Sequence, residues 1–286
     1  MLGRWEYMTV EKILKVISRE LEDIPGVVGV VLGGSRARGT DHPNSDIDIG
    51  IYYDESKGFK VSEINTIATK IDDEHRKNII TTLGEWGPWV NGGGWLIVQG
   101  HHVDFILREI KRVSQVIDDC SKGKVFPNYQ TGHPHAYINV MYMGEISICK
   151  VLLDSKNYIS KLKAKTIPYP KDLQNAILEY FMFEASFSLM LAKANIDKDD
   201  ISYVCGHCFR SISCLNQVIF ALNEEYCINE KRAVKMAAGF KIKPQDYKIK
   251  IDEIVTLISS NKENVIKAGD ILQELVNETK RLIENK

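Results

Sequence analysis

Two neighbouring segments carry most of the information in this chain of 286 residues. The first reads Gly33-Gly34-Ser35-Arg36-Ala37-Arg38-Gly39-Thr40, and the second, after a short polar connection, reads Ser45-Asp46-Ile47-Asp48-Ile49. The apolar run Val27–Leu32 before the first segment is typical of a buried strand. The glycines that end it lack Cβ atoms, and their turn leaves backbone N–H groups unpaired. The backbone there can therefore approach a phosphate closely.

The second segment predicts a strand with one buried face. Isoleucines alternate with Asp46 and Asp48 along it, and residues two apart on a strand point to the same side. The two carboxylates therefore project together and repel each other unless a cation lies between them. Mg²⁺ prefers oxygen ligands and completes its shell with water and substrate phosphate. A carboxylate pair beside a phosphate-cradling turn thus predicts a site for a metal–nucleotide complex.

A third acid is needed to hold a second metal near the attacking oxygen in two-metal phosphoryl and nucleotidyl transfer. Asp104 fits this role, because it stands alone among apolar residues on a later predicted strand.

The rest of the chain predicts an α+β fold in two parts. Residues 1–160 are expected to form a mixed β-sheet with flanking helices, and residues 161–286 an all-α helical bundle. The expected elements of the first part are a helix from about Val10 to Ile24, a helix between about Ser62 and Ile80, a loop rich in Gly and Trp from Gly84 to Gly94, a hairpin of Trp95–Gln99 and His102–Leu107, and a helix from Val113 to Cys120. In the second part, Asp172 and Asp200 are expected helix N-caps.

These motifs resemble the DNA polymerase β-type nucleotidyltransferase superfamily. Its smaller members share the run Gly-Ser-x-Ala-Arg-Gly followed by Ser-Asp-x-Asp, and the likeness covers about Val27 to Leu107. The helical C-terminal part looks like the antibiotic nucleotidyltransferases of the aminoglycoside and lincosamide types, although no motif there fixes the substrate.

The resemblance implies a role for each matching residue. Asp46 and Asp48 would ligate two Mg²⁺ ions and Asp104 the catalytic one, while Gly34 and Ser35 would hold the terminal phosphates of an NTP, which we take to be ATP. Arg36 or Arg38 would add a charge-assisted phosphate contact. An acceptor hydroxyl would attack the α-phosphorus in line, with pyrophosphate leaving. The general base is open between Asp104, Glu85 and Glu184.

Composition narrows the partners. The 37 Lys and Arg residues balance 38 Asp and Glu, whereas a nucleic-acid-binding domain commonly has a pI above about 9. We therefore expect the acceptor to be a hydroxyl of a small molecule, with an aminoglycoside-like antibiotic as one candidate. We expect no extended nucleic-acid surface. No stretch approaches the roughly 20 apolar residues of a membrane span, and charged residues interrupt the N-terminus where a secretory core would lie. We expect a cytoplasmic protein, and a homodimer is compatible with the resemblance.

Other functions remain open at this point. One alternative is an antitoxin-type enzyme that nucleotidylates protein or tRNA, and another is a non-catalytic nucleotide-binding regulatory module. The run Cys205-Gly206-His207-Cys208 lies inside a predicted helix, which favours structural residues over redox or zinc chemistry. His133 and His135 on a turn, and the tryptophans Trp86, Trp89 and Trp95, are candidates for lining an acceptor pocket, or equally for packing.

Overall fold

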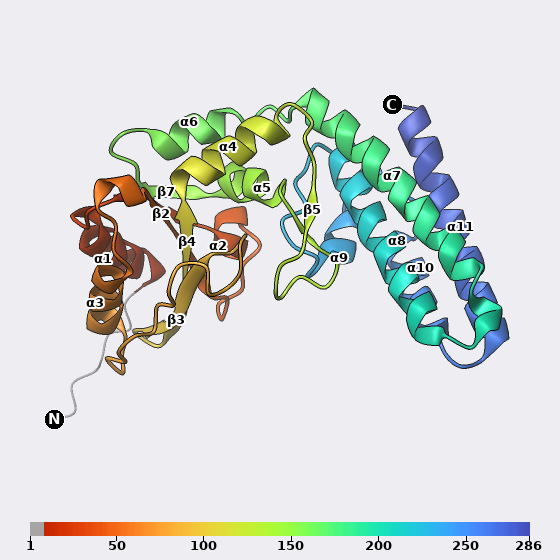
Figure 1. The fold of residues 1–286 in the computed structure, drawn as a ribbon, viewed down its shortest axis with the longest axis horizontal. Coiled ribbons are helices and arrows are strands. Elements are labelled where there is room, and N and C mark those ends of the chain that lie inside the picture. Colours follow the sequence, from red (N-terminus) through yellow and green to blue (C-terminus); the bar gives the residue numbers. More distant parts are fainter. Residues whose placement is uncertain (1–8) are drawn as a thin grey trace. The chain divides into compact units, whose positions relative to one another are not determined.

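A computed structural model describes residues 9–286; the first residues of the N-terminus, where we expect no secretory core, lie outside the described residues. Contacts divide the chain into two compact units (Figure 1). The sheet unit runs up to Asp118 and includes Glu145–Pro168, and the helical unit contains Asp119–Gly144 and Tyr169–Lys286. The predicted boundary near residue 160 stays a prediction.

A five-stranded mixed sheet forms the centre of the sheet unit. Its strands are β1 (Val27–Leu32), β2 (Ile47–Tyr53), β3 (Gly92–Val98), β4 (His101–Glu109) and β7 (Lys150–Leu153). They lie in the order β3-β4-β2-β1-β7, with β2 parallel to β4 and the other neighbours antiparallel. The helices of this unit are α1 (Val10–Glu22), α2 (Gly34–Arg38), α3 (Val61–Ile71), α4 (Ile110–Cys120), α5 (Met141–Ile148) and α6 (Tyr158–Ala164), and the unit division falls within α4 and α5.

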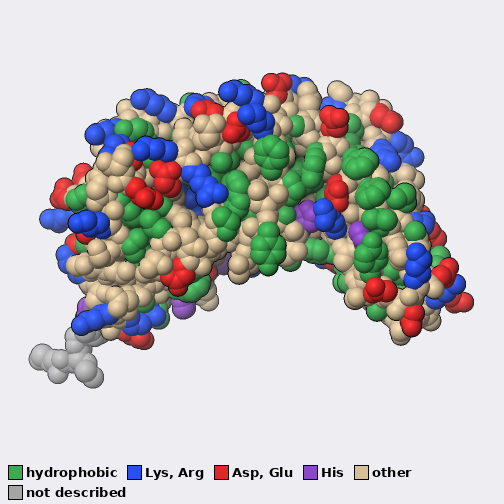
Figure 2. Space-filling model, viewed as in Figure 1, with side chains coloured by type: hydrophobic (Ala, Val, Ile, Leu, Met, Phe, Trp, Pro, Cys, Tyr) green, Lys and Arg blue, Asp and Glu red, His purple; other side chains and the backbone are tan. Residues whose placement is uncertain are grey.

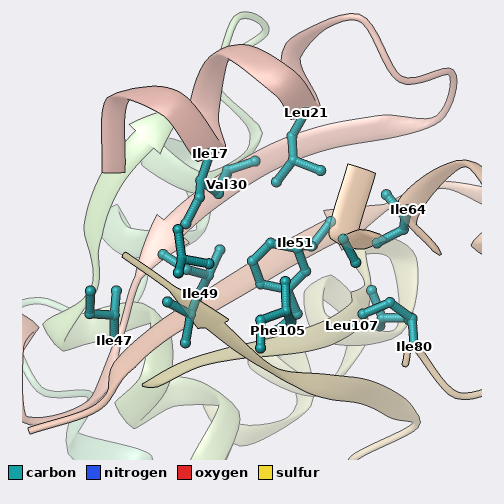
Figure 3. Packing of buried hydrophobic residues seen from close by; sticks show 14 of the residues in the cluster. Ile17, Leu21, Val30, Ile47, Ile49, Ile51, Ile64, Ile80, Phe105 and Leu107 are labelled. Carbon is teal, nitrogen blue, oxygen red and sulfur yellow. The ribbon is translucent and has the colours of Figure 1, made fainter. Parts of the chain in front are cut away.

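One face of this sheet is fully apolar. The isoleucines of β2 pack with side chains from β1, β4, α1 and α3, as Figure 3 shows. Ile47, Ile49 and Ile51 are 0% exposed, so the alternation read from the sequence places its isoleucine face in the core. Burial of each such side chain stabilises the fold by about 1.5–3 kcal/mol. This core fixes which way every residue of β2 points.

The predicted hairpin of β3 and β4 is confirmed, but β3 begins earlier than expected. Gly92–Gly94 belong to the strand rather than to the loop before it. At Gly94 a Cβ atom would lie 2.3 Å from the backbone oxygen of Ile79, closer than any real contact. The glycines therefore form strand because a neighbouring segment of backbone packs directly on them, and composition alone suggests a loop instead.

The second helix is shorter than predicted. It ends at Ile71 rather than near Ile80. The cause is Asp72, which is fully buried and accepts hydrogen bonds from Ile97 N (3.0 Å) and from Arg76 Nη2 (2.6 Å). A buried carboxylate needs such partners, and meeting them turns the chain out of the helix.

The helical unit contains the long helices α7 (Lys171–Lys193), α8 (Ile201–Leu222) and α11 (Lys262–Glu284), the shorter α9 (Ala233–Ala237) and α10 (Tyr247–Leu257), and the two-residue strands β5 (Pro127–Asn128) and β6 (Tyr137–Ile138). The predicted α+β fold class, with a mixed sheet followed by a helical region, is confirmed. Asp200 caps α8 by accepting a hydrogen bond from Tyr203 N. Asp172 is not a cap, since Pro170 holds that position. No helix within residues 9–286 is both long and apolar enough to span a membrane.

We expect Gly94→Ala to lower the free energy of unfolding by about 1–3 kcal/mol, because the added methyl group overpacks the contact with Ile79. Thermal denaturation followed by circular dichroism measures the effect. The control is Gly206→Ala in α8, where a Cβ meets nothing within 4 Å and helix propensity raises stability by up to about 1 kcal/mol. An unchanged melting midpoint for Gly94→Ala would contradict the packing argument.

Candidate active site

Two of the three predicted acids, Asp48 and Asp104, lie on neighbouring interior strands of the sheet, on the face opposite the core. Asp48 of β2 is paired in parallel register with Asp104 of β4, and directly paired residues of adjacent strands project to the same side. Both carboxylates are half-buried. Asp46 lies two residues before Asp48, is exposed, and precedes the first residue of β2. Because the isoleucines are buried on one face of the sheet, the carboxylates of Asp48 and Asp104 both project from the opposite face.

Gly34 lies directly against the Asp48 carboxylate. Gly33 N donates a hydrogen bond to the Asp48 backbone oxygen (2.8 Å) and ties the turn to β2. Gly34 has φ of 59°, and a Cβ atom there would lie 1.7 Å from Asp48 Oδ2. Any other residue would displace the carboxylate, so glycine is required by both conformation and space. Ser35 follows as the second residue of α2.

Arg36 holds the connection between α2 and β2. Its guanidinium donates to the backbone oxygens of Ser45 (2.6 Å from Nη2) and Asp46 (3.1 Å from Nε), and it forms an ion pair with Asp41 (3.2 Å). The Arg36 side chain is only 10% exposed. These contacts position Asp46 at the start of β2, a role that the sequence motif did not reveal.

The acids influence one another electrostatically. Burial, and after it the negative charges of Asp48 and Asp46, raise the pKa of Asp104 to about 6. Such mutual repulsion is what a bound cation would relieve, and the oxygen donors suit a hard divalent ion. In residues 9–286, however, no three His, Cys, Asp or Glu side chains are gathered closely enough to form a ready metal-binding group. The acids lie near one another without being closed around an ion.

Comparison with known families identifies the sheet unit. Residues 10–125 match the family model of the nucleotidyltransferase domain. The chain carries a nucleotidyltransferase domain. The match contains the turn, the three acids and the sheet strands that present them, and it confirms the predicted enzyme class, a nucleotidyltransferase.

Solved structures that resemble the chain include a bacterial protein. A nucleotidyltransferase-like protein from Exiguobacterium sibiricum, 10% identical, aligns over 96% of this chain and 78% of its own with a TM-score of 0.47. At this TM-score the likeness carries no argument about the site. No curated protein matches the chain.

Lys150 is a cation beside the glycine–serine turn that sequence reasoning missed. It begins β7, is paired with Leu32 at the end of β1, and donates from Nζ to the Arg36 backbone oxygen (3.1 Å). Its side chain therefore lies beside α2. Only the pairing of β1 with β7, across more than a hundred residues of sequence, brings it there, and no local pattern signals that pairing.

The other two candidates for the general base, Glu85 and Glu184, each have partners in their own unit. Glu85 caps a turn by accepting from Thr82 N (3.0 Å). In the helical unit, Glu184 forms an ion pair with Arg210.

The histidine turn of the helical unit is held together by its own contacts. His133 lies 3.0 Å from Glu230, whose other oxygen accepts from His135 N (3.1 Å). These bonds describe a packed structural turn.

The two cysteines of the run Cys205-Gly206-His207-Cys208 lie inside α8. Cys205 is exposed and Cys208 is buried, and both are free. Burial raises the pKa of Cys208 to about 11, which disfavours the thiolate that redox chemistry needs.

The raised pKa of Asp104 predicts a pH-dependent cost in stability. Because this pKa is about 6 rather than the usual 3.8, the ionised carboxyl destabilises the folded chain, fully above about pH 6 and not at all well below pH 4. We expect Asp104→Asn to melt at a higher temperature than the natural chain at pH 7.5 and at the same temperature at pH 3.5, in EDTA.

The matched control has the opposite sign. Hydrogen bonds from Ser56 and Lys111 lower the pKa of Asp54, so Asp54→Asn should melt lower at pH 7.5, and the difference should shrink as the pH falls below about 4. If Asp104→Asn instead destabilises the chain at pH 7.5, the inference that burial and the neighbouring charges disfavour the ionised Asp104 carboxyl is wrong.

Proposed function

We propose that this nucleotidyltransferase is Mg²⁺-dependent and moves AMP from ATP onto a hydroxyl of a small molecule, with release of pyrophosphate. The observation that carries the proposal is a row of neighbouring residues that runs across the strands of the sheet. Gly34 lies against Asp48, and Asp48 is paired with Asp104. A phosphate-approaching turn therefore adjoins two carboxylates that face the same side.

Different residues would bind the phosphates, position the acids and receive the acceptor. The bare backbone at Gly34 and Ser35 lets the terminal phosphates approach, and the cations of Arg38 and Lys150 offset their charge. Arg36 acts through Asp46, whose backbone it holds. In-line attack then requires the acceptor to approach from the side of Asp104 that is remote from α2. Positioning and electrostatics supply most of the acceleration in such transfers.

The donor set fits the implied metal in its chemistry, since three neighbouring carboxylates repel one another. Asp46 and Asp48 would ligate both of two Mg²⁺ ions. Asp104 would be a further ligand of the catalytic one of these two ions. When bound, Mg²⁺ neutralises phosphate charge and lowers the pKa of the attacking hydroxyl.

The near-neutral charge of the chain, 37 cations against 38 anions, supports a small acceptor over a nucleic acid, and an aminoglycoside-like polyol is the class that we test first. Six free cysteines among the described residues support a reducing, cytoplasmic setting.

We also propose a homodimer formed through α7. Tyr180, Phe183, Phe187 and Met190 are between 39% and 68% exposed, and Figure 2 shows hydrophobic side chains on this face of the helical unit. Their spacing of three, four and three residues is that of a two-helix seam. In an antiparallel pair with a second copy, Tyr180 meets Met190 and Phe183 meets Phe187.

The charges at the two ends of this seam support an antiparallel second copy. Glu179 and Lys193 flank the apolar stripe at opposite ends of α7, and both are exposed, Lys193 also forming an ion pair with Asp270 of α11 (2.9 Å). In the antiparallel arrangement Glu179 of each copy faces Lys193 of the other.

We expect Asp48→Asn to lower Mg²⁺-dependent pyrophosphate release in the presence of an acceptor by at least about 100-fold, because one preorganised charge at the reacting phosphate is lost. A screen of antibiotics and other polyols with each NTP, read by mass gain of the acceptor, supplies the acceptor. Asp118→Asn is the control, since Asp118 is an exposed partner of Lys165 and should retain activity.

Full release by Asp48→Asn would contradict the assignment. Calorimetry that detects NTP binding without turnover across the whole panel would favour the non-catalytic module instead, and nucleotidylation of protein or tRNA alone would favour the antitoxin-type enzyme.

We expect Phe183→Glu to convert the dimer to a monomer at micromolar concentration, because it places a charge in the centre of the α7 seam. Light scattering after size exclusion measures the mass. Val255→Glu in α10, at a site 62% exposed, should remain dimeric. A monomeric natural chain at tens of micromolar would contradict the seam.

A further inference from the structure

The row of residues across the active site extends by one position beyond the acids. Trp95 of β3 is paired in antiparallel register with Asp104, so its side chain projects to the same side as the Asp104 carboxylate. The full order is therefore Trp95, Asp104, Asp48 and Gly34, from β3 to the turn before α2. Trp95 is 63% exposed, which is unusual for the largest apolar side chain next to a candidate catalytic centre.

A second indole supports Trp95 from one side. The Trp86 and Trp95 rings are stacked, with centroids 4.8 Å apart and planes inclined by 29°. Gly93 makes room for this arrangement, since a Cβ atom there would lie 2.7 Å from Trp86 Cζ3. Because Gly93 has no side chain, the Trp86 ring can lie over β3 beside Trp95. We call these two rings the tryptophan pair.

The loop that carries Trp86 is fixed to the sheet unit. Arg108, only 4% exposed, donates to Val90 O (2.8 Å) and forms an ion pair with Glu145 (2.7 Å). Arg112 lies over the Trp89 ring at 4.5 Å. These contacts hold the loop without any ligand, so the tryptophan pair is a preorganised surface, and ordering it costs a ligand little entropy.

The position of the pair assigns it to one substrate. The phosphates are proposed to lie at Gly34, on the far side of Asp48, and in-line transfer places the acceptor opposite the leaving pyrophosphate. That side is β4 and β3. We propose that the tryptophan pair binds the acceptor by stacking a ring face on Trp95, which makes Trp95 a specificity-determining residue for ring-bearing hydroxyl acceptors. This inference rests on the proposed function.

The spacing sets the shape of such an acceptor. Side chains directly opposite on antiparallel strands start about 4.5–5.5 Å apart, which is about the width of one six-membered ring. The acceptor therefore needs a flat, apolar ring face over the indole and a hydroxyl on the same ring, or the next atom, pointing to Asp104. A saturated sugar or cyclitol ring and an aromatic ring both meet this requirement, whereas an open-chain hydroxyl does not.

The test compares Trp95→Ala and Trp95→Phe with the control Trp89→Phe, whose ring lies against Arg112 instead. Ring-bearing probes are kanamycin, lincomycin, adenosine and N-acetyltyrosinamide, and open-chain probes are sorbitol and N-acetylserinamide. Binding is read by tryptophan fluorescence, nucleotide affinity by calorimetry with α,β-methylene-ATP and Mg²⁺, and transfer by acceptor mass gain. Sugars and aromatic rings are thus distinguished by which probes bind.

We expect ring-bearing probes to change the fluorescence of the natural chain and of Trp89→Phe but not of Trp95→Ala. For the acceptor that is modified, Trp95→Ala should raise KM about tenfold with kcat nearly unchanged, because stacking on an aromatic side chain contributes to binding in this range. Trp95→Phe should restore KM to within about threefold. The Kd of α,β-methylene-ATP should be the same in all variants.

Three results would overturn the inference: no ring-bearing probe binds, KM is unchanged in Trp95→Ala, or the nucleotide Kd is the constant that rises. Failure of the proposed function is a separate result. If ring-bearing probes bind through Trp95 but no acceptor gains mass with any NTP, the tryptophan pair stands as a ring-binding site and the transfer reaction is wrong.

Discussion

The parallel pairing of β2 with β4 is the constraint on which the rest of the site depends. Both strands bury one face completely, and the period of two residues then leaves no freedom in where Asp48 and Asp104 point. A slip of one residue in either strand would send an acid into the core and expose an isoleucine or a phenylalanine. The energy that fixes the carboxylates is therefore hydrophobic, although the site itself is polar. Repulsion between the acids is tolerated because the core outweighs it.

Around this pair of strands, glycines leave room for the side chains of neighbouring segments. Gly34 leaves room for the Asp48 carboxylate, and Gly93 leaves room for Trp86. The guanidinium of Arg36, by contrast, donates hydrogen bonds to backbone oxygens of the loop before β2. The motif Gly-Ser-x-Ala-Arg-Gly therefore has mechanical functions besides any contact with phosphate: it shapes the turn and fastens the segment that presents Asp46.

The sequence predicts those features that depend on local period and spacing. The strand of Asp48, the hairpin carrying Asp104 and the capping of α8 by Asp200 are of this kind, whereas Asp46, predicted on the same strand, lies just before it. What it misses depends on contacts between distant segments. Gly94 lies in a strand because the backbone of Ile79 packs on it, and Lys150 reaches α2 only through the pairing of β7 with β1. The end of α3 is set by the buried partners of Asp72. No local pattern contains this information.

The even balance of charge in the composition conceals an uneven distribution at the site. The charges of Asp48 and Asp46 add to burial in raising the pKa of Asp104, while the nearest motif arginine, Arg36, is engaged by the protein itself. In the proposed function, Arg38 and Lys150, which comes from a remote strand, are the cations that would contact the phosphates. On the opposite side of the acids the residue next in line is uncharged, aromatic and exposed. On our proposal, a site with cations on one flank and an indole on the other would distinguish its two substrates by chemistry: the polyanion would bind beside α2, and the ring-bearing acceptor on β3.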